Sequence, residues 1–139
     1  KAVVKEAEDG EVIEKGHVYI APGGMHIIIA QSGKNHVIRY SDQPPVDGLR
    51  PCANIMFESL SDTDYDDITC VVLTGMGADG TKGIQSLVDK GRRVHVIAQD
   101  AESCIVYGMP RAIAEAGLAN EIQPLNKISE SIIKNVGVM

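Results

Sequence analysis

The clearest pattern of apolar and polar positions lies in the middle of the chain, at residues 68–90. Residues 68–73 (ITCVVL) form a nearly unbroken apolar and β-branched run, which is typical of a strand buried on both faces of a parallel sheet. Three glycines follow this run: Gly75, Gly77 and Gly80. Apolar residues then recur at helical spacing: Ile84, Leu87 and Val88. The pattern predicts a strand, a glycine-rich turn and a helix, and it places Asp79 beyond the carboxyl end of the strand, where α/β proteins keep ligands and catalytic groups.

Similar patterns predict the remaining elements. Short strands are expected at residues 3–7, 17–21, 93–98 and 121–122, and helices at residues 51–60 (with Pro51 in the first turn), 110–116 and from about 124 onward. Two β-rich runs, residues 26–30 and 36–40, flank a short polar segment and predict an antiparallel hairpin. The expected fold is a doubly wound α/β domain whose mainly parallel sheet has helices on both faces and carries an antiparallel β-hairpin.

Composition narrows the possible partners. The chain has 139 residues and a net charge of −6, which argues against a nucleic-acid backbone or an anionic membrane surface as the partner. No run approaches the roughly 18 apolar residues of a membrane span, and no signal peptide is recognisable. The three cysteines are widely spaced without a C-x-x-C pair, so reduced thiols in a cytoplasmic protein are expected, with neither disulfide nor zinc.

No cofactor or metal is expected. His17, His26 and His36 have spacings that fit no compact metal triad, and we interpret them as strand residues, with His26 the best candidate for another role because it follows a Pro-Gly-Gly loop. The acidic segment at residues 61–67 begins like a calcium loop. It lacks the glycine and glutamate that such a loop needs at its sixth and twelfth positions, and it is predicted to be a solvated loop.

The glycine-rich turn has three possible interpretations. The first is dinucleotide binding, because the three glycines match G-x-G-x-x-G and Asp100 follows about 20 residues later. The charge of Asp79 opposes it, since the pyrophosphate of the cofactor would lie at the same helix amino-terminus.

The second interpretation is a structural aspartate that caps the helix, and the third is the acid of a Ser-His-Asp system. A helix amino-terminus favours the ionised form of Asp79 that both roles need. The sequence contains no G-x-S-x-G elbow, and nothing beyond proximity supports pairing Ser103 with His95. The residues alone therefore leave these interpretations open.

Four blocks of sequence, in the same order, resemble the catalytic domain of the chemotaxis receptor methylesterases, the CheB protein-glutamate methylesterase family. The most specific are VVLTGMGADGTKG (residues 71–83) and AQDAESCIVYGMPRAIAEAG (residues 98–117). Two earlier blocks are KEAEDGEVIEKGHVYIAPGGMH (residues 5–26) and RPCANIMFESL (residues 50–60). The resemblance covers almost the whole chain.

The resemblance implies a cytoplasmic serine hydrolase that removes methyl groups from γ-glutamyl methyl esters on chemoreceptors and, in some members, deamidates receptor glutamines. Asp79 corresponds to the acid of the family's catalytic triad. Met76, Gly75 and Gly77 correspond to residues in the vicinity of its active site. The partners implied are the cytoplasmic domains of methylated chemoreceptors and a receiver domain of the same parent chain, which a histidine kinase phosphorylates.

The family's nucleophilic serine and its histidine lie earlier in the domain, so residues 1–139 are expected to be the later two-thirds of a methylesterase domain, without the receiver domain and inactive alone. Three residues differ from the family's pattern and bear on substrate details: Leu49, Cys52 and Asn54. A non-catalytic binding module is the alternative from another class of protein.

Overall fold

The computed structural model describes residues 1–137, and the chain forms two compact units, Lys1–Tyr65 and Asp66–Met139. The first unit contains two strand pairs. β1 (Val3–Glu6) and β2 (His17–Ile20) are parallel, and β3 (His26–Ser32) and β4 (Asn35–Ser41) form the predicted antiparallel hairpin, with Ile29 opposite Ile38. Both pairs confirm the expected strands.

The core of the first unit lies between the strand pairs. Ala7, Ile27 and Ile38 are buried there, and partly buried apolar residues surround them: Ile13, Tyr19, Ile29 and Met56. Helix α1 (Ala53–Ser59) packs on β3 and continues into a short 3-10 helix, η1 (Leu60–Asp62). The prediction that Pro51 lies in the first turn of this helix is wrong, because Cys52, in extended conformation, precedes the first helical residue.

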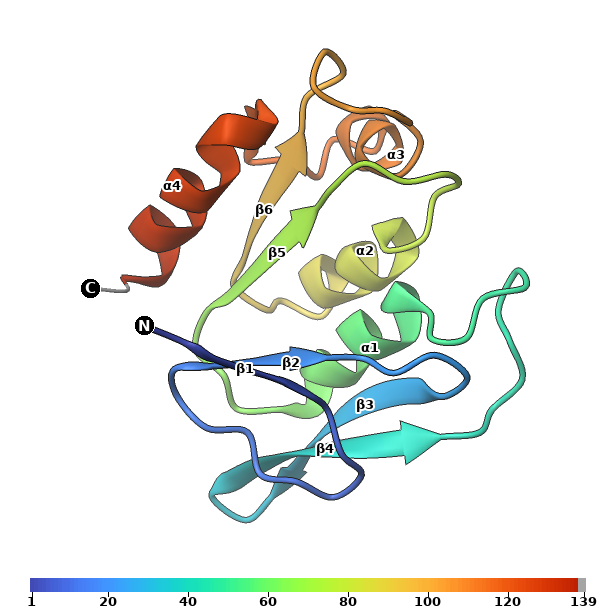
Figure 1. Ribbon diagram of the computed structural model, residues 1–139, viewed down its shortest axis with the longest axis vertical. Helices are drawn as coiled ribbons and strands as arrows, with labels where there is room; N and C mark the ends of the chain where they lie inside the picture. Colours follow the sequence, from blue (N-terminus) through green and yellow to red (C-terminus); the bar gives the residue numbers. More distant parts are fainter. Residues whose placement is uncertain (138–139) are drawn as a thin grey trace. The chain divides into compact units, whose positions relative to one another are not determined.

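The second unit is a three-stranded parallel sheet with helices on both faces. Its strands are β5 (Ile68–Val72), β6 (Val94–Gln99) and β7 (Glu121–Gln123), in that spatial order. Figure 1 shows α2 (Thr81–Asp89) and α3 (Met109–Glu115) on one side of β5 and β6, and α4 (Leu125–Val136) on the other. This arrangement confirms the predicted fold class.

The apolar run at residues 68–73, most of which forms β5, lies in the core of the second unit. Ile68, Cys70 and Val72 of β5 are buried, and the residues between them are half-buried, because helices cover both faces of the sheet. Ile84 and Leu87 of α2 are fully buried, as is Ile113 of α3. In α4, Ile128 is buried, whereas Leu125, Ile133 and Val136 are about half exposed.

Two loops extend from the carboxyl ends of the central strands. We call residues 73–80, between β5 and α2, the glycine loop, and residues 100–108, between β6 and α3, the β6–α3 loop. Because β5 and β6 are parallel neighbours, both loops leave the sheet at the same edge. No helix within residues 1–137 is long and apolar enough to cross a membrane.

Candidate active site

Asp79 stands at the end of the glycine loop, immediately before α2, and is half-buried. The N-cap residue of α2 is Gly80, with a φ of 100°. The interpretation of Asp79 as the N-cap residue is therefore wrong by one position. Gly80 takes that place because its backbone adopts a left-handed conformation that residues with a Cβ rarely adopt.

The backbone of Gly75 pairs with the β6–α3 loop. The Gly75 N–H donates to the carbonyl of Val106 at 3.0 Å, and the Gly75 carbonyl accepts from the amides of Gly108 (3.1 Å) and Met109 (2.8 Å). These bonds hold the first half of the glycine loop beside the start of α3. They also form a one-residue parallel bridge between Gly75 and Tyr107, beyond the end of the sheet.

The contact between the loops is so close that a Cβ on Gly75 or on Gly108 would lie less than 3.0 Å from atoms of the other loop or of the start of α3. A Cβ on Gly108 would lie 2.7 Å from the Gly75 carbonyl oxygen and 2.9 Å from the Gly77 nitrogen. A Cβ on Gly75 would lie 2.6 Å from Sδ of Met109. Close packing against a second loop thus accounts for Gly75 without a bound phosphate, and Gly77, with a φ of 86°, supplies a left-handed turn.

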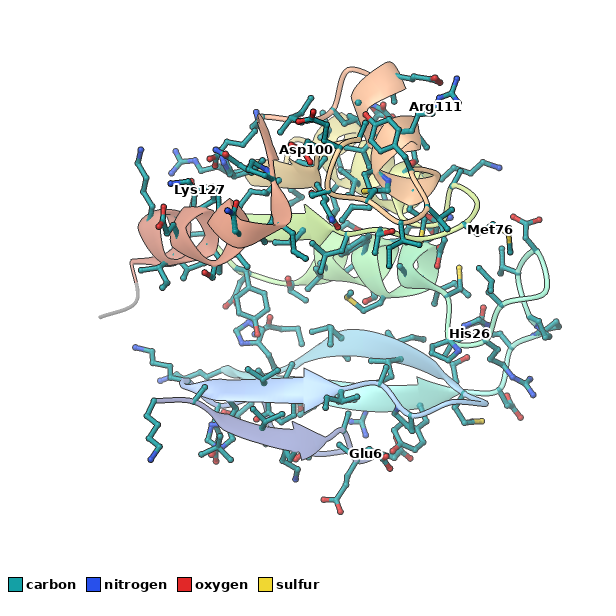
Figure 2. All side chains as sticks on the ribbon, turned by 45° about the horizontal axis from the view of Figure 1, so that its top comes forward. Glu6, His26, Met76, Asp100, Arg111 and Lys127 are labelled. Carbon is teal, nitrogen blue, oxygen red and sulfur yellow. The ribbon has the colours of Figure 1, made fainter. Side chains whose placement is uncertain are left out.

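All four predicted site residues lie in the glycine loop. Met76 is 85% exposed and projects from the loop after β5, as Figure 2 shows. Gly75 and Gly77 flank it, and Asp79 follows at the helix end of the same loop. The segment at residues 99–110 is joined to this loop by the backbone hydrogen bonds of Gly75.

Asp100 is engaged within its own loop, at the carboxyl end of β6 (Figure 2). Its Oδ1 accepts hydrogen bonds from the Ser103 hydroxyl at 2.6 Å and the Ser103 amide at 2.9 Å. These bonds lower the pKa of Asp100 from its ordinary value. The hydrogen bonds to Ser103 give Asp100 a structural role in this turn. The acidic residue of the dinucleotide fingerprint is therefore accounted for without a cofactor ribose.

The structure separates His95 from Ser103. His95 is the second residue of β6, and Ser103 follows the opposite end of that strand. His95 Nε2 instead contacts Oε2 of Glu121 at 2.5 Å, and this bond, with further donors from Gln123 and Asn135, lowers the pKa of Glu121 to about 2. The pair does not form a nucleophile–base arrangement.

The other histidines have local partners in the first unit. His26 is fully buried, and its Nε2 lies 3.0 Å from the carbonyl oxygen of Pro44. His17 Nδ1 contacts the carbonyl of Lys15, while His36 contacts Asp64 and stacks on Tyr65. Within residues 1–137 no three His, Cys, Asp or Glu side chains are grouped so that they could hold a metal ion.

The structure also shows where the cysteines lie and where the chain differs from the family pattern. Within residues 1–137 none of the three cysteines forms a disulfide, and Cys52 and Cys70 are buried while Cys104 is half-buried. Cys52 precedes α1 and Asn54 lies in its first turn, whereas Leu49 is 43% exposed in the preceding loop. All of these positions except Cys70 and Cys104 belong to the first unit.

The sequence did not identify two residues that hold the loops of this site together. Thr74 exchanges hydrogen bonds with Val106, and the side chain of Gln99 is buried between the two loops and bonded to both. Neither matches a catalytic motif. The only signal available was a polar residue at the carboxyl end of each apolar strand, which is where α/β proteins place functional groups.

A scan against models of protein families matches residues 1–132 to the CheB methylesterase family. A protein-glutamate methylesterase/protein-glutamine glutaminase of Desulfotalea psychrophila is 48% identical over 135 residues, which are 96% of this chain and 36% of that protein. A protein of the same name from Geobacillus kaustophilus is 43% identical, with coverages of 96% and 38%. This chain thus spans less than two-fifths of the length of these relatives.

The fold is also that of a solved structure. The crystal structure of the Thermotoga maritima CheB methylesterase catalytic domain superimposes with a TM-score of 0.87 and 36% sequence identity. The match covers 94% of this chain and 68% of that one. Sequence and fold therefore point to the same relatives.

Proposed function

This chain belongs to the CheB methylesterase family, and on that premise we propose that it supplies the aspartate-bearing part of a protein-glutamate methylesterase. The substrate is a γ-glutamyl methyl ester on the cytoplasmic part of a chemoreceptor, and the products are the free glutamate side chain and methanol. The observation that carries the proposal is the position of Asp79, at the carboxyl end of β5 in a loop fixed by a second loop, in a chain that the family model matches over residues 1–132.

The proposed chemistry is that of a Ser-His-Asp hydrolase. A serine oxygen attacks the ester carbonyl while a histidine accepts the serine proton, and methanol leaves with that proton as the acyl-enzyme forms. Water then attacks the acyl-enzyme with the histidine again as base, the bond between the acyl carbon and the serine oxygen breaks, and the histidine returns the proton to the serine as the glutamate side chain is released. Asp79 orients the histidine and stabilises its protonated form. The serine and the histidine belong to a segment of the parent protein that precedes these residues.

The other residues of the glycine loop shape the surroundings of the reacting ester. The backbone at Gly75, Met76 and Gly77 lies in the same loop as Asp79, and Met76 is largely exposed there. In this proposal the backbone of Met76 contributes to the site that receives the developing oxyanion. Fixed backbone dipoles are well suited to this task because they need no reorganisation during the reaction.

The same site would release ammonia from a receptor glutamine. The relatives from Desulfotalea and Geobacillus carry both names, methylesterase and glutaminase. An amide differs from a methyl ester only in its leaving group, and the acyl-enzyme formed from either is identical. We therefore include deamidation of glutamine as a second activity of this site. We also propose that the parent protein is cytoplasmic and that it carries a receiver domain, which a histidine kinase phosphorylates.

Methanol release tests the proposal. Membranes that contain radiolabelled methylated chemoreceptors are incubated with the full-length protein or with residues 1–139 alone. Release of labelled methanol by the full-length protein only is the expected result. Release by neither would favour a non-catalytic binding module, and release by residues 1–139 alone would mean that the nucleophile lies within this chain. Saturable binding of NAD, followed by fluorescence, would revive the dinucleotide interpretation.

A further inference from the structure

Gln99 is the least exposed polar residue at the carboxyl edge of the sheet. It is the last residue of β6, and its exposed fraction is 1%. A buried amide side chain is costly unless its oxygen and nitrogen both find partners. The partners of Gln99 therefore show what this buried amide holds together.

The oxygen of the Gln99 amide binds the glycine loop. Oε1 accepts a hydrogen bond from the backbone amide of Thr74 at 2.8 Å. Thr74 directly precedes Gly75, whose amide and carbonyl bind the β6–α3 loop. Gln99 thus fixes the backbone at the point where the chain leaves β5 and enters the loop that carries Asp79.

The nitrogen of the same amide binds the β6–α3 loop. Nε2 donates to the carbonyl oxygen of Ser103 at 2.9 Å and to its hydroxyl oxygen at 3.1 Å. The Ser103 hydroxyl in turn donates to Asp100 at 2.6 Å and accepts from the amide of Leu125, the first residue of α4, at 3.0 Å. Gln99 is therefore a buried side-chain link between the glycine loop and a second loop that has anchors of its own.

The amide can take only one orientation. If it were reversed, Nε2 would face the N–H of Thr74 and Oε1 would face the carbonyl oxygen of Ser103, so a donor would meet a donor and an acceptor an acceptor. A neutral group that accepts at one end and donates at the other is needed. Among side chains of this size only glutamine and a protonated glutamate meet that requirement.

From these contacts we propose that Gln99 is a positioning residue, which sets the backbone of Thr74 and Gly75 and through it the place of Met76 and Asp79. This proposal rests on the proposed methylesterase function for its catalytic consequence, but its structural part stands alone. Gln99 does not contact the substrate. It acts by holding the glycine loop, and displacement of catalytic groups by about 1 Å can cost on the order of 10²-fold in rate.

Three variants of the full-length protein separate positioning from simple loss of packing. Gln99→Met keeps the volume and removes both hydrogen-bonding ends. Gln99→Glu keeps the acceptor for Thr74, but as a carboxylate it places a negative oxygen against the carbonyl of Ser103. Once protonated it donates there, and burial raises the pKa of such a carboxyl group towards neutrality. Ser103→Ala leaves the carbonyl partner of Nε2 in place, but it removes the hydroxyl and with it the bonds to Nε2, Asp100 and the amide of Leu125.

The experiment measures kcat and KM for methanol release at several values between about pH 8 and about pH 6, each expressed relative to the wild-type protein at the same pH. We expect Gln99→Met to lower kcat on the order of 10²-fold with little change in KM. The relative kcat of Gln99→Glu should rise as the pH falls, whereas that of Gln99→Met should stay constant. Ser103→Ala should lower kcat less than Gln99→Met does, because Gln99 keeps its bonds to the amide of Thr74 and the carbonyl of Ser103.

Amide hydrogen exchange supplies a readout that does not depend on activity. The amide of Thr74 should exchange faster in Gln99→Met, and in Gln99→Glu it should regain protection at low pH. Unchanged exchange at Thr74 would overturn the proposal, as would wild-type kcat in Gln99→Met or equal pH profiles for the two Gln99 variants. If the wild-type protein released no methanol, the methylesterase proposal would fail, and exchange alone would decide the role of Gln99.

Discussion

Thr74 and Val106 are joined by two hydrogen bonds through a single hydroxyl group. Oγ1 of Thr74 donates to the carbonyl of Val106 at 3.1 Å and accepts from the amide of Val106 at 2.9 Å. The residues are 32 positions apart in sequence. The hydroxyl group of Thr74 nevertheless joins the two loops in the way that paired backbone groups join neighbouring strands of a sheet. The glycine loop is therefore held by side chains as well as by backbone.

Removal of this hydroxyl group should loosen the glycine loop. Thr74→Val keeps the shape of the side chain but loses both bonds, and we expect turnover of the full-length protein to fall on the order of tenfold. Stability should change by no more than about 1 kcal/mol, because water can replace the lost partners of these exposed groups. Thr74→Ser retains the hydroxyl and is the matched control. Equal turnover in both variants would show that the bonds do not position the loop.

The two glycines at the loop contact should differ in their tolerance of alanine. In Gly108→Ala the new Cβ meets backbone atoms of Gly75 and Gly77 at 2.7–3.0 Å, so the glycine loop itself must move. In Gly75→Ala it meets the end of the flexible Met109 side chain, which can turn aside. We expect Gly108→Ala to cost about 1–3 kcal/mol of stability and most of the activity.

Gly75→Ala should cost clearly less on both measures, and Gly75→Ala with Met109→Ala should recover part of that loss. Urea unfolding and methanol release measure the two effects on the same preparations. If Gly75→Ala were the more damaging change, the close approach of the two loops would not be the reason for these glycines.

Stability should depend on pH through Glu121. The hydrogen bond from His95 is the main cause that lowers the pKa of Glu121 to about 2 from its ordinary 4.5. Because the folded-state pKa lies below the unfolded one, the stabilisation is fully present above about pH 4.5 and is lost as the pH falls towards 2. Glu121→Gln should therefore be less stable than the wild-type protein at neutral pH, and the difference should narrow as the pH falls through that range.

Urea unfolding at neutral and acidic pH measures this difference. Glu115→Gln is the control, since Glu115 pairs with Arg111 on an exposed face of α3 and such pairs contribute less than about 1 kcal/mol. A constant difference between Glu121→Gln and the wild-type protein at all pH values would contradict the assigned shift in pKa.

The thiols should differ in reactivity. Burial at the centre of β5 raises the pKa of Cys70 to about 12, and its exposed fraction is 1%. The reactive thiolate is therefore scarce and inaccessible at Cys70, whereas Cys104 is only half-buried in the β6–α3 loop. Alkylation of the native protein, followed by mass spectrometry, should modify Cys104 first and Cys70 only on unfolding. Cys104→Ser should abolish the fast phase, and rapid modification of Cys70 would contradict its burial.

Much of the fold was predictable because its signals are local. The apolar run before Gly75 specifies a buried strand, and the hairpin and the later strands follow from short β-rich runs between turn residues. The errors lie at element boundaries. Pro51 precedes its helix rather than entering it, and Gly80 rather than Asp79 is the N-cap residue, because backbone conformation decides these positions and composition only biases them.

The candidate site was predictable only where a motif marks it. The glycine loop and Asp79 stand out in the sequence through the three glycines, although the choice between a cap, a cofactor loop and a triad acid needed the family resemblance. The roles of Gln99 and Thr74 could not be foreseen, because each depends on partners 4 to 32 residues away. The pairing of His95 with Glu121 was hidden for the same reason.

The role of Asp79 is the central claim, and turnover of the full-length protein with Asp79→Asn tests it most directly. Asparagine has nearly the same size but cannot stabilise a protonated histidine, so we expect turnover to fall by about 10⁴-fold, as for the acid of other Ser-His-Asp systems. Asp89→Asn, at the end of α2, is the control and should retain wild-type turnover. Turnover of Asp79→Asn within about tenfold of wild type would contradict the account and remove Asp79 from the triad.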